Sequence, residues 1–124
     1  MVRSIFALAA VLSVATASLA RDLVTPAVYV GPSTSVACKL LNITSAPVPA
    51  QVQLIEVFSG TVLAEYAPNP VPLLAQGVYG VGKSYPNTTV FCRFVNASLS
   101  KFRGSLIEQV PTGDGTDTIV IPAQ

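Results

Sequence analysis

Cys38 and Cys92, the only cysteines of this chain, each lie in the middle of a segment that alternates between apolar and other side chains. A period of two residues is typical of a β-strand with one buried face. If the two cysteines bond, both point into the core, and Lys39 and Arg93 lie on the outside. The residues expected on the buried face beside the cysteines are Val36, Leu40, Val90 and Phe94.

Residues 1–20 have the features of a secretory signal peptide. Arg3 supplies a basic start, residues 5–14 form a largely apolar run, and residues 18–20 provide the small-x-small pattern of a cleavage site. The apolar run is shorter than the roughly 18 residues that a bilayer crossing needs. We therefore expect cleavage after residue 20, or alternatively after Ala17, and a secreted or periplasmic mature protein without stable membrane insertion.

In such an oxidising compartment, a lone pair of cysteines is expected to form a disulfide. A redox or metal role is not indicated, because Cys38 and Cys92 lie far apart in the sequence and form no Cys-x-x-Cys spacing. The chain also has no histidine that could complete a metal site.

The mature part, residues 21–124, suffices for a single domain. Loss of Arg3 with the signal peptide leaves six basic and six acidic residues, so the net charge is zero. Such a domain offers no electrostatic footprint for nucleic acid or anionic lipid. The absence of histidine and tryptophan removes the commonest general base, the commonest metal ligand and the strongest stacking ring for sugars. No enzymatic activity, cofactor or metal is therefore expected.

The rest of the mature chain is predicted to form short strands separated by turns. Besides the two cysteine segments, the expected strands are 24–30, 52–58, 61–66, 101–109 and 118–121, with 73–74 as a short candidate. This makes seven or eight antiparallel strands without helical periodicity, a pattern typical of an all-β sandwich.

Three connections in this scheme carry specific expectations. Ser59-Gly60 is expected to form a two-residue hairpin turn. In that register Val57 pairs with Val62, Ile55 with Ala64 and Leu54 with Glu65; the first four form the inner face, and Glu56 and Glu65 lie on the other. The prolines of residues 67–72 favour an extended crossing from one sheet to the other. Gly77, Gly80, Gly82 and Pro86 predict a loop or an irregular edge strand over residues 76–87, and residues 111–115 predict a turn.

The pairing of two cysteines from distant strands resembles the inter-sheet disulfide of immunoglobulin-like domains. The chain has no tryptophan to pack on the bridge, and Val90 stands where antibody-type domains carry the corner tyrosine. The runs 38–44, 52–58, 60–64 and 91–94 are also similar to short exported bacterial proteins of unknown function. This resemblance implies an exported, immunoglobulin-like β-sandwich closed by one disulfide, with no assigned activity.

Residues 77–84 satisfy the phosphate-binding pattern G-x-x-x-x-G-K-[ST] letter for letter. Phosphate binding requires a helix directly after the pattern, and Pro86 with the following Thr88-Thr89-Val90 opposes one. Asp114 and Asp117 offer two carboxylates near a turn, too few oxygens for a calcium ion. A plain glycine-rich loop and a plain hairpin turn are the expected interpretations.

Asn42, Asn87 and Asn96 each begin an Asn-x-Ser/Thr triplet. They predict N-glycosylation if the host is a eukaryote. In a bacterium, which the resemblance favours, the triplets carry little meaning.

Two classes of function remain. The first is a non-catalytic interaction or structural module of the cell envelope or extracellular space, with a protein partner. The second is a small-ligand or glycan binder that uses the loop 76–87, with Tyr79 and Tyr85 as stacking platforms and Lys83 exposed beside them. The competing interpretation is that Tyr79 and Tyr85 only cover the edge of the sandwich. The partner, the ligand and the oligomeric state are left open by the sequence.

Overall fold

The computed structural model describes residues 22–73, 77–84 and 86–124, and of residues 67–73, 83 and 84 it describes only the backbone. The predicted signal peptide, residues 1–20, lies outside the described residues. The described part is all-β, as predicted, with nine strands where seven or eight were expected. The strands are β1 (Leu23–Val24), β2 (Val28–Val30), β3 (Ser35–Asn42), β4 (Val48–Glu56), β5 (Val62–Leu73), β6 (Val78–Ser84), β7 (Thr88–Val95), β8 (Phe102–Thr112) and β9 (Gly115–Pro122).

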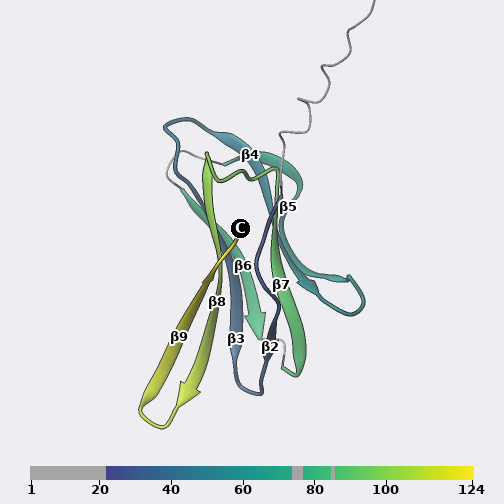
Figure 1. The fold of residues 1–124 in the computed structure, drawn as a ribbon, viewed down its shortest axis with the longest axis vertical. Helices are drawn as coiled ribbons and strands as arrows, with labels where there is room; N and C mark the ends of the chain where they lie inside the picture. Colours follow the sequence, from purple (N-terminus) through teal and green to yellow (C-terminus); the bar gives the residue numbers. More distant parts are fainter. Residues whose placement is uncertain (1–21, 74–76, 85) are drawn as a thin grey trace, which may run out of the picture.

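The strands form two antiparallel sheets that face each other (Figure 1). In the first sheet, β7 is flanked by β1 and β2 on one side and by β4 on the other, and β5 forms the outer edge next to β4. The second sheet has the order β6-β3-β8-β9. The backbone of Gln124 exchanges two hydrogen bonds with that of Val24, so the C-terminal end of the second sheet is tied to β1 of the first.

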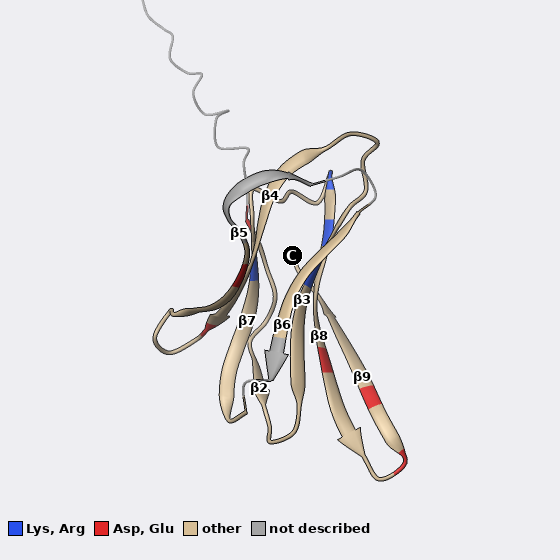
Figure 2. Ribbon diagram, turned by 180° about the vertical axis from the view of Figure 1, so that it is seen from behind, with Lys and Arg blue, Asp and Glu red and all other residues tan. Residues whose placement is uncertain are grey.

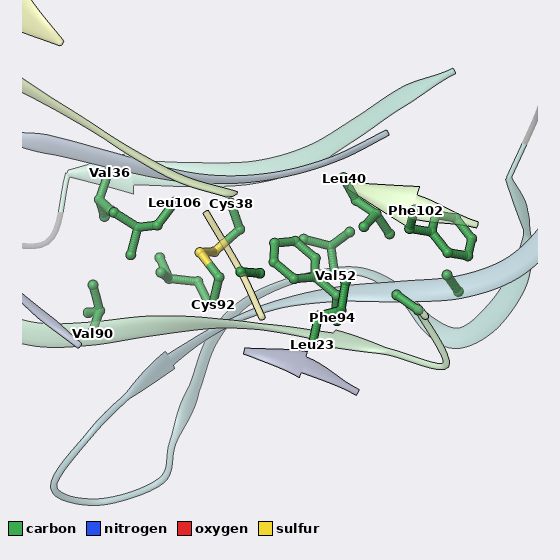
Figure 3. Close-up of a cluster of buried hydrophobic side chains, with 14 of the residues drawn as sticks. Leu23, Val36, Cys38, Leu40, Val52, Val90, Cys92, Phe94, Phe102 and Leu106 are labelled. Atoms are coloured by element: carbon green, nitrogen blue, oxygen red, sulfur yellow. A yellow bond between two sulfur atoms is a disulfide. The ribbon is translucent and has the colours of Figure 1, made fainter. Parts of the chain in front are cut away.

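The core lies between the sheets, with the disulfide near its middle (Figure 3). Cys38 of β3 bonds Cys92 of β7, and their Cα atoms lie 5.6 Å apart. Both cysteines are fully buried, whereas Lys39 and Arg93 are exposed. The alternating neighbours expected on the buried face are all in the core: Val36, Leu40, Val90 and Phe94. The disulfide and the face assignment of both cysteine strands are therefore confirmed.

Close packing in this core depends on one glycine. A Cβ atom at Gly104 of β8 would lie 2.7 Å from Cε2 of the Phe94 ring, which real Cβ contacts do not allow. Gly104 thus lets the fully buried ring of Phe94 lie directly against the backbone of the opposite sheet.

The single strand predicted over residues 24–30 is wrong, because the chain divides there into β1 and β2. Between them, the Thr25 hydroxyl oxygen accepts a hydrogen bond from the amide of Cys92 at 2.9 Å, and the Thr25 amide donates to the Cys92 carbonyl at 3.0 Å. Pro26 follows, and it has no amide hydrogen to continue the ladder. A side-chain hydrogen bond therefore substitutes for one rung of the sheet.

The predicted register of the β4–β5 hairpin is wrong. Ile55 pairs with Val62, Leu54 with Ala64 and Gln53 with Glu65. The expected inner face is right only in part: Ala64 packs against the core and Ile55 is buried, whereas Val62 is 42% exposed and Leu54, which was not expected on that face, is fully buried. The cause lies in the turn, which is longer than two residues, because the Glu56 amide donates to the Thr61 carbonyl and the Gly60 amide to the Glu56 carbonyl.

The proline-rich segment is not a crossing between sheets. Residues 67–72 belong to β5, and Pro49, Ala50 and Val48 of β4 pair with Pro72, Val71 and Leu73. Because β5 is the outer strand of its sheet, prolines without amide hydrogens can face the unpaired side. The crossing comes later, between Leu73 and β6, which lies in the second sheet.

Two further expectations change only in extent. The last two strands are longer than predicted, 102–112 and 115–122, and the turn between them narrows to Gly113 and Asp114. The short candidate strand 73–74 is represented by Leu73 as the end of β5, while Leu74 lies outside the described residues.

Candidate functional site

Of the two alternatives predicted for residues 76–87, a loop or an irregular edge strand, the described residues largely form the edge strand. Residues Val78–Ser84 form β6, which pairs with β3 along its length. The glycines allow the two strands to approach: a Cβ atom at Gly80 would lie 2.6 Å from the Cys38 carbonyl oxygen, and one at Gly82 would lie 2.7 Å from the Ala37 Cβ. Glycine here serves close backbone packing rather than loop flexibility. The phosphate-binding pattern therefore lies on a strand that is followed by another strand, β7.

The predicted contact surface consists of three residues: Tyr79, Lys83 and Tyr85. Tyr79 lies in β6, where it pairs with Leu40 of β3. Its side chain is half-buried and packs against the core. Its ring centroid lies 5.3 Å from that of Tyr66, so at Tyr79 the structure favours the interpretation of an edge-covering ring. Lys83 lies in β6 opposite Val36, with only its backbone described, and Tyr85 lies outside the described residues.

The outer face of the second sheet is hollowed over β6, β3 and β8. The hollow measures about 500 Å³ and is lined by small or aliphatic residues such as Ala37, Gly80, Gly82 and Ile107. Lys39 stands at its border, and a Cβ at Gly80 would lie 2.6 Å from the Lys39 Cδ, so the Lys39 stem crosses the glycine strand. Polar groups of Ser35, Lys39 and Gln109 also line this hollow, but none of its described lining residues is aromatic.

A second hollow, which we call the aromatic hollow, lies where the β4–β5 turn meets β2 and the start of β7. It measures about 430 Å³. Its lining residues are Tyr29, Glu56, Phe58, Ser59, Thr61, Leu63, Asn87, Thr88 and Thr89. Phe58 is 85% exposed and Tyr29 is 60% exposed. Two exposed aromatic side chains around one concave surface form the strongest candidate for a binding site in the described part of the chain.

Hydrogen bonds hold the turn that carries Phe58 and, on the other side of the aromatic hollow, the ring of Tyr29. The Glu56 carboxylate accepts hydrogen bonds from the amides of Phe58 and Ser59, the latter at 3.2 Å, which fixes the turn that carries Phe58. The Val57 amide donates to the Thr89 carbonyl at 2.9 Å and anchors this turn to β7. Across the hollow, the Tyr29 hydroxyl donates to the Asn87 Oδ1 at 2.9 Å. The exposure of the two rings is therefore a property of a fixed backbone.

Sequence reasoning missed this site. Tyr29 was placed inside a single strand 24–30 and Phe58 at the end of a strand, so neither was a candidate. The available signal was Phe58, a large apolar residue directly before the predicted turn at Ser59-Gly60. A side chain next to a turn lies away from the core and is therefore a candidate for exposure. Among the described residues of the predicted segment 76–87, Asn87 lines the aromatic hollow.

The acidic residues are not gathered into a common site. Glu56 binds the amides of its turn, whereas Glu65 accepts a hydrogen bond from the Gln53 Nε2 at 2.9 Å. Asp114 lies in the turn between β8 and β9, and Asp117 lies in β9. Among residues 22–73, 77–84 and 86–124, no group of three or more potential ligand side chains is placed to hold a metal ion.

The three Asn-x-Ser/Thr triplets differ in accessibility. Asn42 is fully buried, donates to the Ala46 carbonyl at 3.0 Å and accepts from the Thr44 amide at 2.9 Å. Asn87 and Asn96 are exposed, with φ angles of 58° and 63° in the left-handed region that asparagine tolerates. Only these last two side chains are accessible to a modifying enzyme in the folded protein.

The described residues contain no helix of the length and apolarity that a membrane crossing requires. Comparisons with protein-family models, curated proteins and solved structures find no match to this chain. The candidate site therefore rests on its own geometry.

Proposed function

We propose that this chain is an exported, non-catalytic interaction module that binds a partner protein through the aromatic hollow. The buried disulfide supports export, because such bonds form and persist in oxidising compartments. The signal-like residues 1–20 agree with this compartment. A role without catalysis is supported by the carboxylates Glu56 and Glu65, each of which is engaged by neighbouring backbone or side-chain donors.

We assign the fold, as part of this proposal, to the immunoglobulin-like sandwiches. In those domains strand B pairs with E, strand C pairs with F, and a disulfide joins B to F. Here β3 pairs with β6, β4 pairs with β7, and the disulfide joins β3 to β7. The flanking strands are exchanged: β8 takes the place of the first strand beside β3, and β1 with β2 takes the place of the last strand beside β7. The four central strands and their disulfide therefore support the assignment.

The exposure of Phe58 is the observation that carries the proposed contact surface. A phenylalanine that is 85% exposed on a hydrogen-bonded turn forgoes the roughly 1.5–3 kcal/mol that burial of its side chain would contribute. A partner that covers Phe58 and Tyr29 recovers this free energy, and the fixed turn limits the entropy lost on binding.

Site-specific photo-cross-linking in the exporting cell tests this assignment. A photoreactive amino acid at position 58 is expected to give a covalent adduct with one partner protein. The matched control is position 78, because Val78 is 63% exposed but lies on the outer face of the other sheet. Adducts from position 78 alone, or equal adducts from both positions, would contradict the proposed surface.

A glycan ligand is the second candidate, and the polar rim of the aromatic hollow favours it. Tyr29 and Phe58 could stack against a sugar ring, while Asn87, Thr61 and Ser59 offer amide and hydroxyl groups beside them. A glycan array with the exported protein would then show saturable binding that Phe58→Ala abolishes without lowering Tm. Absence of saturable binding across the array leaves the protein partner as the proposal.

A further inference from the structure

The outer face of the second sheet carries basic side chains and, among the described residues, no acidic ones. Because Cys38 faces the core, the odd-numbered residues of β3 and the residues paired with them on β6 and β8 lie on the outer face. Lys39 and Arg103 belong to this outer set. Glu108 and Asp117 lie on the opposite face, and in Figure 2 the acidic segments of this sheet lie toward the β8–β9 turn, away from its basic ones. Charge is therefore segregated on this sheet.

A hollow of about 390 Å³ is bordered by both of these cations, and we call it the basic hollow. Its polar side chains are those of Lys39, Arg103 and Ser105, and its apolar side chains are Leu41, Val78, Pro122 and Ala123. Val78 is 63% exposed. The basic hollow therefore combines positive charge with accessible aliphatic surface.

The guanidinium of Arg103 is held at the basic hollow without a carboxylate partner. Its Nη1 donates hydrogen bonds to the carbonyl oxygens of Leu99 and Phe102, the latter at 2.8 Å. Its Nε and Nη2 make no hydrogen bond with residues 22–73, 77–84 and 86–124. Within those residues, no carboxylate lies at ion-pair distance from Lys39 or Arg103. A fixed guanidinium with two nitrogens available is positioned to bind a planar or tetrahedral anion.

The lining of the basic hollow also restricts the kind of anion. Two cations match one anionic group, whereas a polyanion such as nucleic acid requires a longer series of basic residues. A neutral sugar would lack a stacking ring, because no aromatic residue is among the described lining residues. The aliphatic side chains instead favour a ligand with an apolar body, and the volume lies within the range of about 300–1,000 Å³ that small-molecule sites have.

We propose that the basic hollow binds a small amphipathic anion, in which a carboxylate or phosphate group is attached to an aliphatic body. The anionic group accepts hydrogen bonds from the open nitrogens of Arg103, and the ammonium of Lys39 neutralises it from β3. The aliphatic body covers Leu41 and Val78 and removes their apolar surface from water. Each half of the ligand therefore has a matching half of the site.

A nuclear magnetic resonance titration of the isotopically labelled exported protein at neutral pH tests this inference. The probes are octanoate and, separately, octyl phosphate, which distinguish a free aliphatic acid from an aliphatic phosphate ester. At least one of them is expected to bind saturably, with the largest shifts at the amides of Leu41, Val78 and Arg103. Octanol lacks the charge and acetate lacks the aliphatic body, so both should bind at least about tenfold more weakly.

Two charge-removing variants test the role of the cations. Lys39→Gln and Arg103→Gln should each raise the Kd of the bound probe by about tenfold. Arg93→Gln is the matched control and should leave the Kd unchanged, because it removes the same charge from the other sheet, where Arg93 pairs with Asp22. Arg103→Gln also removes the hydrogen bond to Leu99, whereas Lys39 has no hydrogen bond to lose among the described residues. Lys39→Gln therefore keeps the test decisive if the other variant fails to fold.

Absence of saturable binding by both anionic probes would overturn the proposal. Equal affinity for octanol, or an unchanged Kd in the folded Gln variants, would overturn it as well, because the cations would then contribute nothing. Shifts centred on Tyr29 and Phe58 would place the ligand in the aromatic hollow and would also contradict it. The two hollows share no lining residue, so failure of this proposal leaves the proposed function untouched.

Discussion

Replacement of Cys38 and Cys92 by alanine tests how this small domain obtains its stability. The disulfide closes a loop with a sequence separation of 54. On the chain-entropy model, a loop of this length stabilises the fold by about 4 kcal/mol at 25 °C. Small domains have total stabilities of only about 5–15 kcal/mol, so the bridge supplies a large share.

The same model predicts that the two single replacements are not additive. Cys38→Ala and Cys92→Ala each open the loop completely, so each should lower the free energy of unfolding by nearly as much as the double replacement. Both positions are fully buried, so the lost sulfur atoms add a smaller packing cost. In a double-mutant cycle, the coupling free energy should therefore approach the entropic value of about 4 kcal/mol.

Urea denaturation followed by circular dichroism is the appropriate assay. The midpoint should fall, and the m-value should rise because the unfolded chain without the bridge exposes more surface. Tm should fall by about 15–30 °C for a domain of this size. Wild-type protein treated with a reductant should unfold like the variants. A loss below about 1 kcal/mol in the double variant would refute the reasoning, since the open chain would then be nearly as constrained as the bridged one.

Two further experiments provide independent tests. Gly104→Ala should lower the free energy of unfolding by about 1–3 kcal/mol in urea titration, because the new Cβ would lie 2.7 Å from a buried phenylalanine ring. Gly113→Ala, where an added Cβ meets nothing within 4 Å, is its matched control and should cost much less; equal losses would contradict the packing argument. When the chain is secreted from a eukaryotic cell, peptide mapping should find glycans on Asn87 or Asn96 and none on Asn42, whose side chain is fully buried. A glycan on Asn42 of correctly folded protein would show that its buried hydrogen bonds are dispensable.

The sequence by itself determined the all-β class, the disulfide and the inward faces of the strands around Cys38 and Cys92. These features are local: alternation with a period of two sets the face of each strand, and one covalent bond between two strands fixes both faces at once. No other pair of strands contains such a constraint. The predicted faces are therefore right for the two strands that the disulfide joins.

Only the tertiary structure decided the hairpin register, the role of the glycines and the place of the candidate site. The register of β4 with β5 follows the longer turn, which the backbone of Glu56 closes through hydrogen bonds with Thr61 and Gly60 and in which the Glu56 carboxylate binds the Ser59 amide. In the sequence, Gly80 and Gly82 indicate a loop. In the structure, their lack of a side chain allows β6 to pair closely with β3. Tyr29 and Phe58 lie 29 positions apart in the sequence and meet at one hollow because β2 and the β4–β5 turn both border the start of β7. Such proximity follows from long-range pairing of strands, which no local pattern specifies.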